Sequence, residues 1–96
     1  MTQKVTIDEY GETQYTLNGK FHREDGPSVI CPSGARFWFI DGEYHRTDGP
    51  AVIWARGTQE WYVNDHQYFS NKKFQEAAGL SDEEMTMLVL QYGNVE

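Results

Sequence analysis

Hydrophobic and polar residues alternate in short runs along most of the chain, and pairs of turn residues interrupt the alternation at regular intervals. Asn18-Gly19 and Asp41-Gly42 are pairs preferred in two-residue type I′ turns, in which both residues need a positive φ. Asn64-Asp65 is a weaker version of the same pair. Aromatic and β-branched residues flank all three pairs, which favours strands over helices. The pattern therefore predicts a series of β-hairpins.

The hairpins belong to an internal repeat with a period of 23 residues. The segment Phe21–Ile30 recurs as Tyr44–Ile53, and both copies contain the sequence His-Arg-x-Asp-Gly-Pro. A third copy stops before this motif, so the chain holds about two and a half copies. Each unit is predicted to be a hairpin plus a linking strand. We expect Asp-Gly-Pro to form the reversal between hairpins, because glycine permits a bend and proline removes a ladder donor.

A different pattern begins at Ser70 and predicts two short helices. Ser70 is suited to cap the first helix, which Gly79 would end. Ser81 and Glu84 match a capping box, in which each side chain accepts a hydrogen bond from the backbone amide of the other residue. Apolar residues at helical spacing follow, up to Gly93.

These elements predict a protein of the α+β class that forms a single domain over residues 1–96. Residues 10–69 are expected to form an antiparallel β-meander of repeated hairpins with a 23-residue period, in about six to eight strands. Residues 70–96 are expected to close it as a helical C-terminal cap of two short helices. A sheet with so few repeats has open edges, which makes homodimerisation a hypothesis.

Strand alternation divides the side chains of the repeat between two faces. The first face is apolar in every copy, which is what a core-forming face requires. Residues at matched places in the copies are interpreted as structural, because an active site is rarely duplicated in this way. The residues given this role are Tyr15, His22, Asp25, Gly26, Trp38, His45, Asp48, Gly49, Trp61 and Tyr68.

The second face differs between copies, being densely aromatic in the middle unit and polar towards both ends. Such variation is not explained by the structural needs of a repeat, so we expect either the C-terminal helices or a partner to cover the middle unit. Aromatic residues supply contact area at interfaces, and charges at the rim mainly speed and orient encounter. The predicted partner-binding residues are the aromatic Phe21, Phe37, Phe39, Tyr44 and Tyr62, with Asp82, Glu83 and Glu84 as an acidic rim.

The net charge of −7 argues against a protein that binds nucleic acid or an anionic membrane directly. Cys31 is the single cysteine, so an internal disulfide is excluded and we expect a reducing compartment, the cytoplasm. The first ten residues include charged side chains and do not resemble a signal peptide. The apolar runs are far shorter than the roughly 20 residues that cross a bilayer.

The sequence His-Arg-x-Asp suggests catalysis, because histidine can act as a general base that a nearby aspartate orients. However, His22 and His45 stand at matched places, and Tyr68 occupies the third, which keeps a flat ring but loses the acid–base function. We therefore expect no catalytic residues. The histidines and Cys31 lack the close-spaced ligand pairs of a zinc site, so no metal and no cofactor is predicted. An imidazole directed into a solvent-filled hollow among ionisable groups would favour an enzyme instead.

The repeated pattern of Gly, Trp or Tyr, Asn-Gly or Asp-Gly, and His-Arg-x-Asp-Gly-Pro resembles repeats of bacteriophages, large DNA viruses and some bacteria. It is similar to a longer form of the MORN-type hairpin repeat, in which aromatic–glycine hairpins stack into an elongated sheet. Residues 15–30 and 38–53 carry the resemblance in full, and residues 57–68 carry its first half. The resemblance implies a stacked scaffold that serves as a binding platform and not as a catalyst.

The leading hypothesis is a non-enzymatic protein-binding module: a small phage-encoded inhibitor of a host defence or nucleic-acid-handling protein complex. Its acidic charge suits a basic partner such as a nucleic-acid-binding protein. One alternative is a structural or adhesin-like virion accessory protein that self-associates. A second alternative is a small enzyme that uses His22 or His45 with a neighbouring aspartate.

Overall fold

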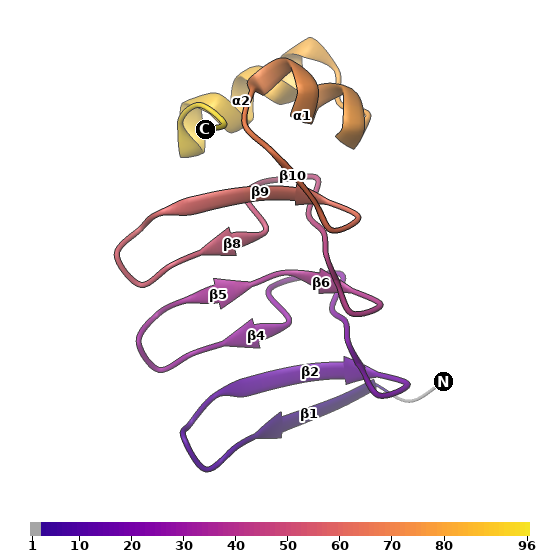
Figure 1. Ribbon diagram of the computed structural model, residues 1–96, viewed down its shortest axis with the longest axis vertical. Helices are drawn as coiled ribbons and strands as arrows, with labels where there is room; N and C mark the ends of the chain where they lie inside the picture. Colours follow the sequence, from indigo (N-terminus) through magenta and orange to yellow (C-terminus); the bar gives the residue numbers. More distant parts are fainter. Residues whose placement is uncertain (1–2) are drawn as a thin grey trace.

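In the computed structural model, which describes residues 3–96, antiparallel strands follow one another along the longest dimension of the molecule (Figure 1). Two helices lie at the C-terminal end of this stack, and the principal dimensions are 40 × 31 × 19 Å. This architecture confirms the predicted α+β class and the antiparallel meander with two C-terminal helices.

The strands are short because loops and turns interrupt them. In chain order they are β1 (Gln3–Ile7), β2 (Thr13–Leu17), β3 (Lys20–Phe21), β4 (Val29–Ile30), β5 (Arg36–Phe37), β6 (Phe39–Ile40), β7 (Glu43–Tyr44), β8 (Val52–Ile53), β9 (Gln59–Val63) and β10 (His66–Tyr68). The helices are α1 (Asn71–Ala78) and α2 (Asp82–Tyr92). An eight-stranded sheet runs in the order β1-β2-β4-β5-β8-β9-β10 with β3 also on β2, and β6 and β7 form a separate pair.

The hairpin turns and their registers follow the prediction. Asn18, Asp41 and Asn64 have φ between 49° and 53°, and the residue after each also has a positive φ. These are the backbone conformations of type I′ turns, which match the twist of the strands they join. The registers pair Thr16 with Phe21, Phe39 with Tyr44, and Trp61 with Tyr68, so the predicted assignment of side chains to faces is confirmed.

The Asp-Gly-Pro segments do not reverse the chain, contrary to the prediction. Both β3 and β4 pair antiparallel with β2, so the chain keeps its direction across residues 22–28. The reversals lie instead at Cys31–Gly34 and Trp54–Gly57, where the glycine N–H donates to the carbonyl three residues earlier. Residues 22–28, here the first loop, and residues 45–51, the second loop, are therefore excursions from a strand that afterwards continues.

Each loop is closed at its base by one residue of the neighbouring strand. Tyr15 accepts from the N–H of His22 and donates to the carbonyl of Ser28, at 3.0 and 2.8 Å. Trp38 does the same for His45 and Ala51, at 3.1 and 2.7 Å. The repeat thus builds the same closed loop twice, and the sheet hydrogen bonds resume beyond it.

The two loops cover the first face of the first two units. The third unit has no such loop, and the helices cover its first face instead. Within each loop an arginine lies over the ring at the base, with 4.0 Å from Arg23 Cζ to the Tyr15 centroid and the same from Arg46 to Trp38. Trp61 is covered by helical residues instead, with Phe74 at 4.8 Å between ring centroids. The resulting core at the helical end consists of Trp61, Val63, Phe74, Met85, Leu88 and Val95.

Both helices have the predicted caps. The Ser70 side chain accepts from the N–H of Lys73, and α1 ends at Gly79, whose φ of 70° is left-handed. Ser81 and Glu84 form the capping box, at 2.9 and 3.1 Å. The hydrogen bonds from Ser81 hold the pKa of Glu84 below its ordinary value. The chain after β10 is therefore directed into two well-terminated helices that pack on β9.

Candidate functional site

Aromatic side chains from five strands lie in contact on the second face of the sheet. We call Phe21, Phe37, Phe39, Tyr44 and Tyr62 together the aromatic face. Ring centroids are 5.2 Å apart between Phe21 and Phe39, 4.4 Å between Phe39 and Tyr44, and 4.9 Å between Tyr44 and Tyr62. The last two pairs are stacked. The register of the middle hairpin places Phe39 opposite Tyr44, because opposed residues of a hairpin share a face. Phe21 and Tyr62 contact this pair from the preceding and following units.

Neither helix packs over the aromatic face, although Tyr44 and Tyr62 also pack against the buried cluster of Trp38, Ala51 and Ile53. The helices lie at the end of the stack and pack on the first face around Trp61 (Figure 1). All five rings remain partly exposed. Each stacked or tilted pair adds about 0.5–1.5 kcal/mol beyond area burial, so the row is held rigidly before any partner arrives.

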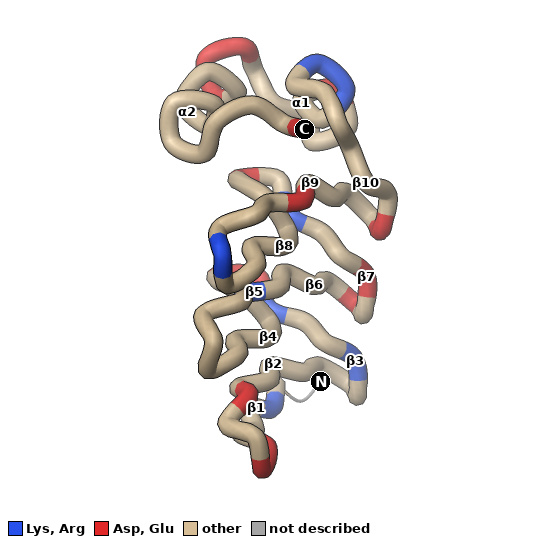
Figure 2. Tube along the Cα trace, turned by 60° about the vertical axis from the view of Figure 1, so that its left-hand side comes forward, with Lys and Arg blue, Asp and Glu red and all other residues tan. Residues whose placement is uncertain are grey.

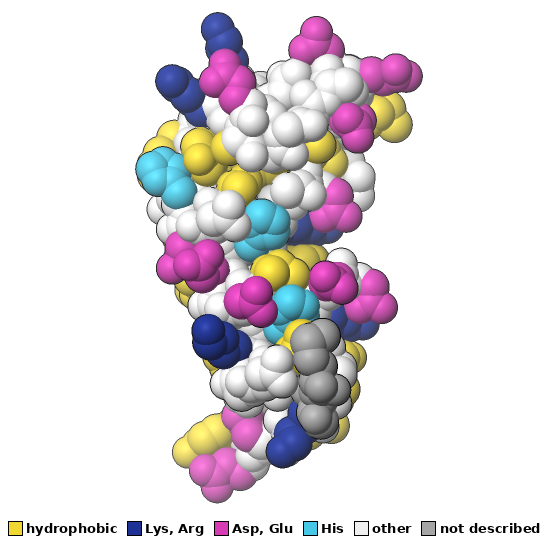
Figure 3. Space-filling view, turned by 90° about the vertical axis from the view of Figure 1, so that its right-hand side faces the viewer, with side chains coloured by type: hydrophobic (Ala, Val, Ile, Leu, Met, Phe, Trp, Pro, Cys, Tyr) yellow, Lys and Arg dark blue, Asp and Glu magenta, His cyan; other side chains and the backbone are white. Residues whose placement is uncertain are grey.

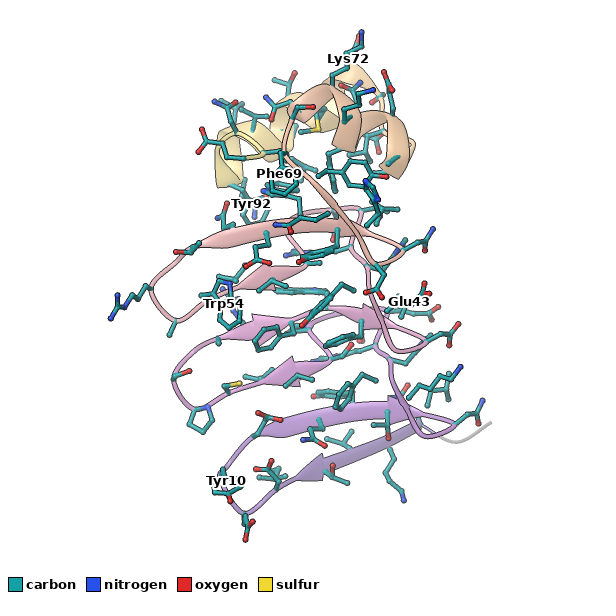
Figure 4. The ribbon with its side chains drawn as sticks, in the orientation of Figure 1. Tyr10, Glu43, Trp54, Phe69, Lys72 and Tyr92 are labelled. Carbon is teal, nitrogen blue, oxygen red and sulfur yellow. The ribbon has the colours of Figure 1, made fainter. Side chains whose placement is uncertain are left out.

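Trp54 extends this surface, and Phe69 is a further exposed ring next to β10; the sequence analysis missed both. Trp54 is 44% exposed and lies edge-on to Phe37, with 5.3 Å between centroids. Phe69 is 66% exposed where the chain leaves β10 for α1 (Figure 4). Strand alternation was the available signal, because Trp54 stands two residues after Val52 and Phe69 two after Gln67, each of which is on the second face.

Glu60 is the carboxylate that contacts this row of rings. Its Oε2 accepts from the indole N–H of Trp54 at 2.7 Å, and its Oε1 accepts from the hydroxyl of Tyr62 at 2.9 Å. Burial and the hydrogen bond to Glu60 raise the pKa of Tyr62 to about 12. Burial, with the charges of Glu60 and Asp65, also raises the pKa of Tyr44. The electrostatic potential at this face is therefore negative.

We expect the pKa of Tyr62 to lie well above the ordinary value for a tyrosine. The unfolded chain releases this proton near pH 10.0, whereas the folded chain keeps it to about pH 12. The folded state then binds more protons across this window, so the free energy of unfolding falls as the pH rises through it. Phenolate absorbance of the wild type minus that of Tyr62→Phe isolates the group. A difference titration centred near pH 10 would contradict the assigned hydrogen bond.

The three acidic residues predicted as a rim lie with the helices. Asp82, Glu83 and Glu84 form the first turn of α2, where carboxylates are favoured by the helix dipole. Figure 2 shows acidic residues at this helical end, beyond the last strands of the sheet. Asp82 accepts from the amide of Gln75 at 2.7 Å, and Glu84 belongs to the capping box. The structure thus brings the five predicted aromatic residues together and places the three acidic ones in helix-terminal roles.

Both loop histidines bond to the turn of the following repeat. His22 Nδ1 accepts from the N–H of Asp41, and His45 Nδ1 accepts from the N–H of Asn64, each at 3.1 Å. The two rings therefore carry the same contact at matched places, which links successive hairpins. In His45 this geometry makes Nδ1 the acceptor and places the proton on Nε2 in the neutral ring. His22 Nδ1 also lies 3.2 Å from the carboxylate of Asp41, so its role as donor or acceptor depends on the tautomer.

A cleft of about 500 Å³ lies between the first and second loops, with Trp38 and Ile40 in its floor. Figure 3 shows this hollow midway along the molecule, bordered by hydrophobic and charged side chains. His45 lines the cleft among ionisable residues, which is one of the conditions stated for an enzyme. Asp25 and Asp48, however, pair with Arg23 and Arg46 of their own loops, at 3.0 and 2.8 Å. The ion pairs within residues 3–96 include none that joins His45 to a carboxylate.

The described residues contain no group of three or more His, Cys, Asp or Glu side chains placed to hold a metal ion. Cys31 Sγ lies 3.5 Å from the Glu12 carboxylate. Burial and this hydrogen bond raise the pKa of the thiol, which disfavours the reactive thiolate.

Searches against known proteins returned no relative: no protein-family model matches the chain, and no curated protein or solved structure matches it. Neither α1 nor α2 is long and apolar enough to span a membrane, and residues 3–96 form no other α-helix. Function is therefore inferred from the geometry of the aromatic face.

Proposed function

We propose that this chain is a non-enzymatic protein-binding module that docks a partner protein on its aromatic face. The observation that supports this proposal is the continuous row of partly exposed rings from Phe21 to Tyr62, which neither helix covers. Clustered exposed aromatic side chains mark interaction sites, and Trp and Tyr dominate the binding energy of interfaces.

Rigidity supports this role. Each ring contacts another ring of the row, with two of the pairs stacked, and the hairpin strands that carry the rings are joined by tight turns. Tyr62 is held further by its bond to Glu60. A surface arranged in this way loses little side-chain entropy when a partner binds, so more of the contact energy contributes to affinity.

The partner class follows from charge and from the repeat. A net charge of −7 suits a basic partner, because complementary fields speed encounter and exclude wrong partners. The resemblance to repeats of phages and large DNA viruses supports a small phage-encoded inhibitor. Its target is a host defence or nucleic-acid-handling complex, and its place of action is the host cytoplasm.

The triple substitution of Phe37, Phe39 and Tyr44 to Ala tests this proposal. We expect it to weaken capture of the partner at least about tenfold, because it removes the centre of the aromatic face. Capture from host lysate, identification by mass spectrometry and titration of the purified partner supply the measurement. Far-ultraviolet circular dichroism checks that the variant is folded. The matched control replaces Met87 and Leu90, two exposed apolar residues of α2, and should leave capture unchanged.

A photo-crosslinking residue at position 54 locates the contact directly. Trp54 is exposed beside the aromatic face, so the bound partner should be cross-linked there and not at position 87. Unchanged capture by the folded triple variant would contradict the proposal. Cross-linking only between copies of the chain, with dimers in light scattering, would instead favour the self-associating virion accessory protein.

A further inference from the structure

We infer that the aromatic face contains a subsite for one guanidinium group of the partner, formed by Glu60, Trp54, Phe37 and Tyr62. This inference rests on the proposed function and names the chemistry recognised at that surface. Two observations support it: the surroundings of the Glu60 carboxylate, and an arginine that binds both a ring and a carboxylate on the opposite face of the same sheet.

Glu60 is positioned but not neutralised. Trp54 and Tyr62 each donate to a different carboxylate oxygen, which fixes the orientation of the group. Each oxygen retains a further acceptor position after these bonds. The ion pairs of residues 3–96 involve Glu24, Asp25, Asp41 and Asp48, and none involves Glu60. A fixed, unpaired carboxylate with two open acceptor positions matches the two parallel N–H donors of an arginine side chain.

The surrounding rings offer faces to a planar cation. Trp54 and Phe37 are nearly perpendicular, at 85° and 5.3 Å, and Phe37 lies 6.5 Å from Tyr44. A guanidinium bound to Glu60 can therefore lie against an aromatic face, a contact that strengthens as water is excluded. An ammonium group is a strongly hydrated point charge and does not use the paired acceptors in this way.

On the opposite face of the sheet, an aromatic ring and a carboxylate also lie close together, and there an arginine of the chain binds both. There Arg46 lies 4.0 Å from the Trp38 centroid while its Nε donates to Asp48 at 2.8 Å. Arg23, Tyr15 and Asp25 repeat this arrangement, at 4.0 and 3.0 Å. Ring and carboxylate on the first face are each satisfied by an arginine of the chain. On the second face, Trp54 and Glu60 lie together, and the ion pairs of residues 3–96 include no arginine bound to Glu60.

A second copy of the chain is a poor occupant of this subsite. Docking the aromatic face on itself would bring two copies of Glu60 into one interface, in a region where burial and the charges of Glu60 and Asp65 already raise the pKa of Tyr44. A positively charged side chain of another protein meets complementary charge at the same place.

The indole N–H of Trp54, followed by nuclear magnetic resonance, tests the inference. The probes are arginine blocked at both ends, blocked citrulline, which has the same shape without the charge, and blocked lysine. We expect blocked arginine to shift the Trp54 signal and blocked citrulline to leave it unchanged. Glu60→Gln keeps an acceptor oxygen for Trp54 and should weaken arginine binding roughly tenfold. The control Glu83→Gln, on α2, should have no effect.

Equal binding of arginine and citrulline, equal binding of arginine and lysine, or full binding by Glu60→Gln would each overturn the guanidinium subsite. The proposed function fails by a different result, since it depends on the loss of partner capture in the triple variant of Phe37, Phe39 and Tyr44. A partner that still requires Phe37, Phe39 and Tyr44 but is captured equally by Glu60→Gln would leave the proposed function standing and remove this inference.

Discussion

Phe74→Ala is expected to lower the free energy of unfolding by about 3–5 kcal/mol, the usual range for deleting a buried phenylalanine ring. Phe74 has no exposed surface and lies 4.8 Å from Trp61, itself almost completely buried. It joins α1 to β9 in the core at the helical end. Since small domains have about 5–15 kcal/mol in total, the variant should unfold at much lower urea concentration, followed by tryptophan fluorescence.

Phe69→Ala supplies the matched control for Phe74→Ala. Phe69 is the same residue type five positions earlier, but it is 66% exposed. Its replacement should change the free energy of unfolding by no more than about 0.5 kcal/mol. Similar losses for the two variants would show that α1 does not seal the end of the sheet through Phe74.

The repeat made most of the fold predictable. Positive-φ pairs such as Asn18-Gly19 define both the turn and the register, and the register then assigns every strand residue to a face. Helix ends were equally readable, because Ser70 and Gly79 act through local hydrogen bonds. These features depend on residues close together in sequence.

The path of the Asp-Gly-Pro loops was not predictable in the same way. Glycine and proline fit a reversal as well as an excursion, and local sequence does not separate the two. The deciding contacts are tertiary. Arg46 packs on Trp38, and the backbone of Trp38 binds both ends of the second loop.

Part of the candidate site was also beyond the sequence analysis. The five rings follow from alternation, but the carboxylate beside them was assigned to α2 instead of β9. Where the helices dock depends on Phe74 meeting Trp61, which nothing in the repeat specifies. Glu60 stands at the place in its unit that Phe37 occupies in the preceding unit. This departure from the repeat was therefore the sequence signal for the carboxylate of the proposed subsite.

Gly49→Ala is expected to cost about 1–3 kcal/mol of stability through a single displaced side chain. A methyl group at position 49 would lie 2.7 Å from Arg46 Cζ, which forces the guanidinium away. Arg46 would lose its place over Trp38 and its hydrogen bond to the hydroxyl of Tyr92 at 3.0 Å. Its bonds to Asp48 and to the Pro50 carbonyl would be weakened as the guanidinium moves. Each bond contributes about 0.5–1.5 kcal/mol, and the ring contact about 0.5–1 kcal/mol or more.

Gly26→Ala should have a smaller effect, although the clash with Arg23 is similar, at 2.8 Å. Arg23 bonds to Asp25 and the Pro27 carbonyl, and it does not reach a helix. Its side chain is 23% exposed, against 12% for Arg46. Thermal or urea unfolding measures the loss of stability in the two variants. An equal loss would contradict a stabilising contribution from the contact between Arg46 and α2.

A double-substitution cycle separates the arginine from the backbone. Gly49 lacks the left-handed φ that would strain an alanine, so the expected cost arises only from the clash with the guanidinium. In an Arg46→Ala background the clash is gone, and Gly49→Ala should then stabilise by about 0.4–1 kcal/mol, because alanine restricts the unfolded chain. The predicted change of sign is the diagnostic result. If Gly49→Ala destabilises equally in both backgrounds, the backbone of the second loop, and not the packing of Arg46 on Trp38, requires glycine there.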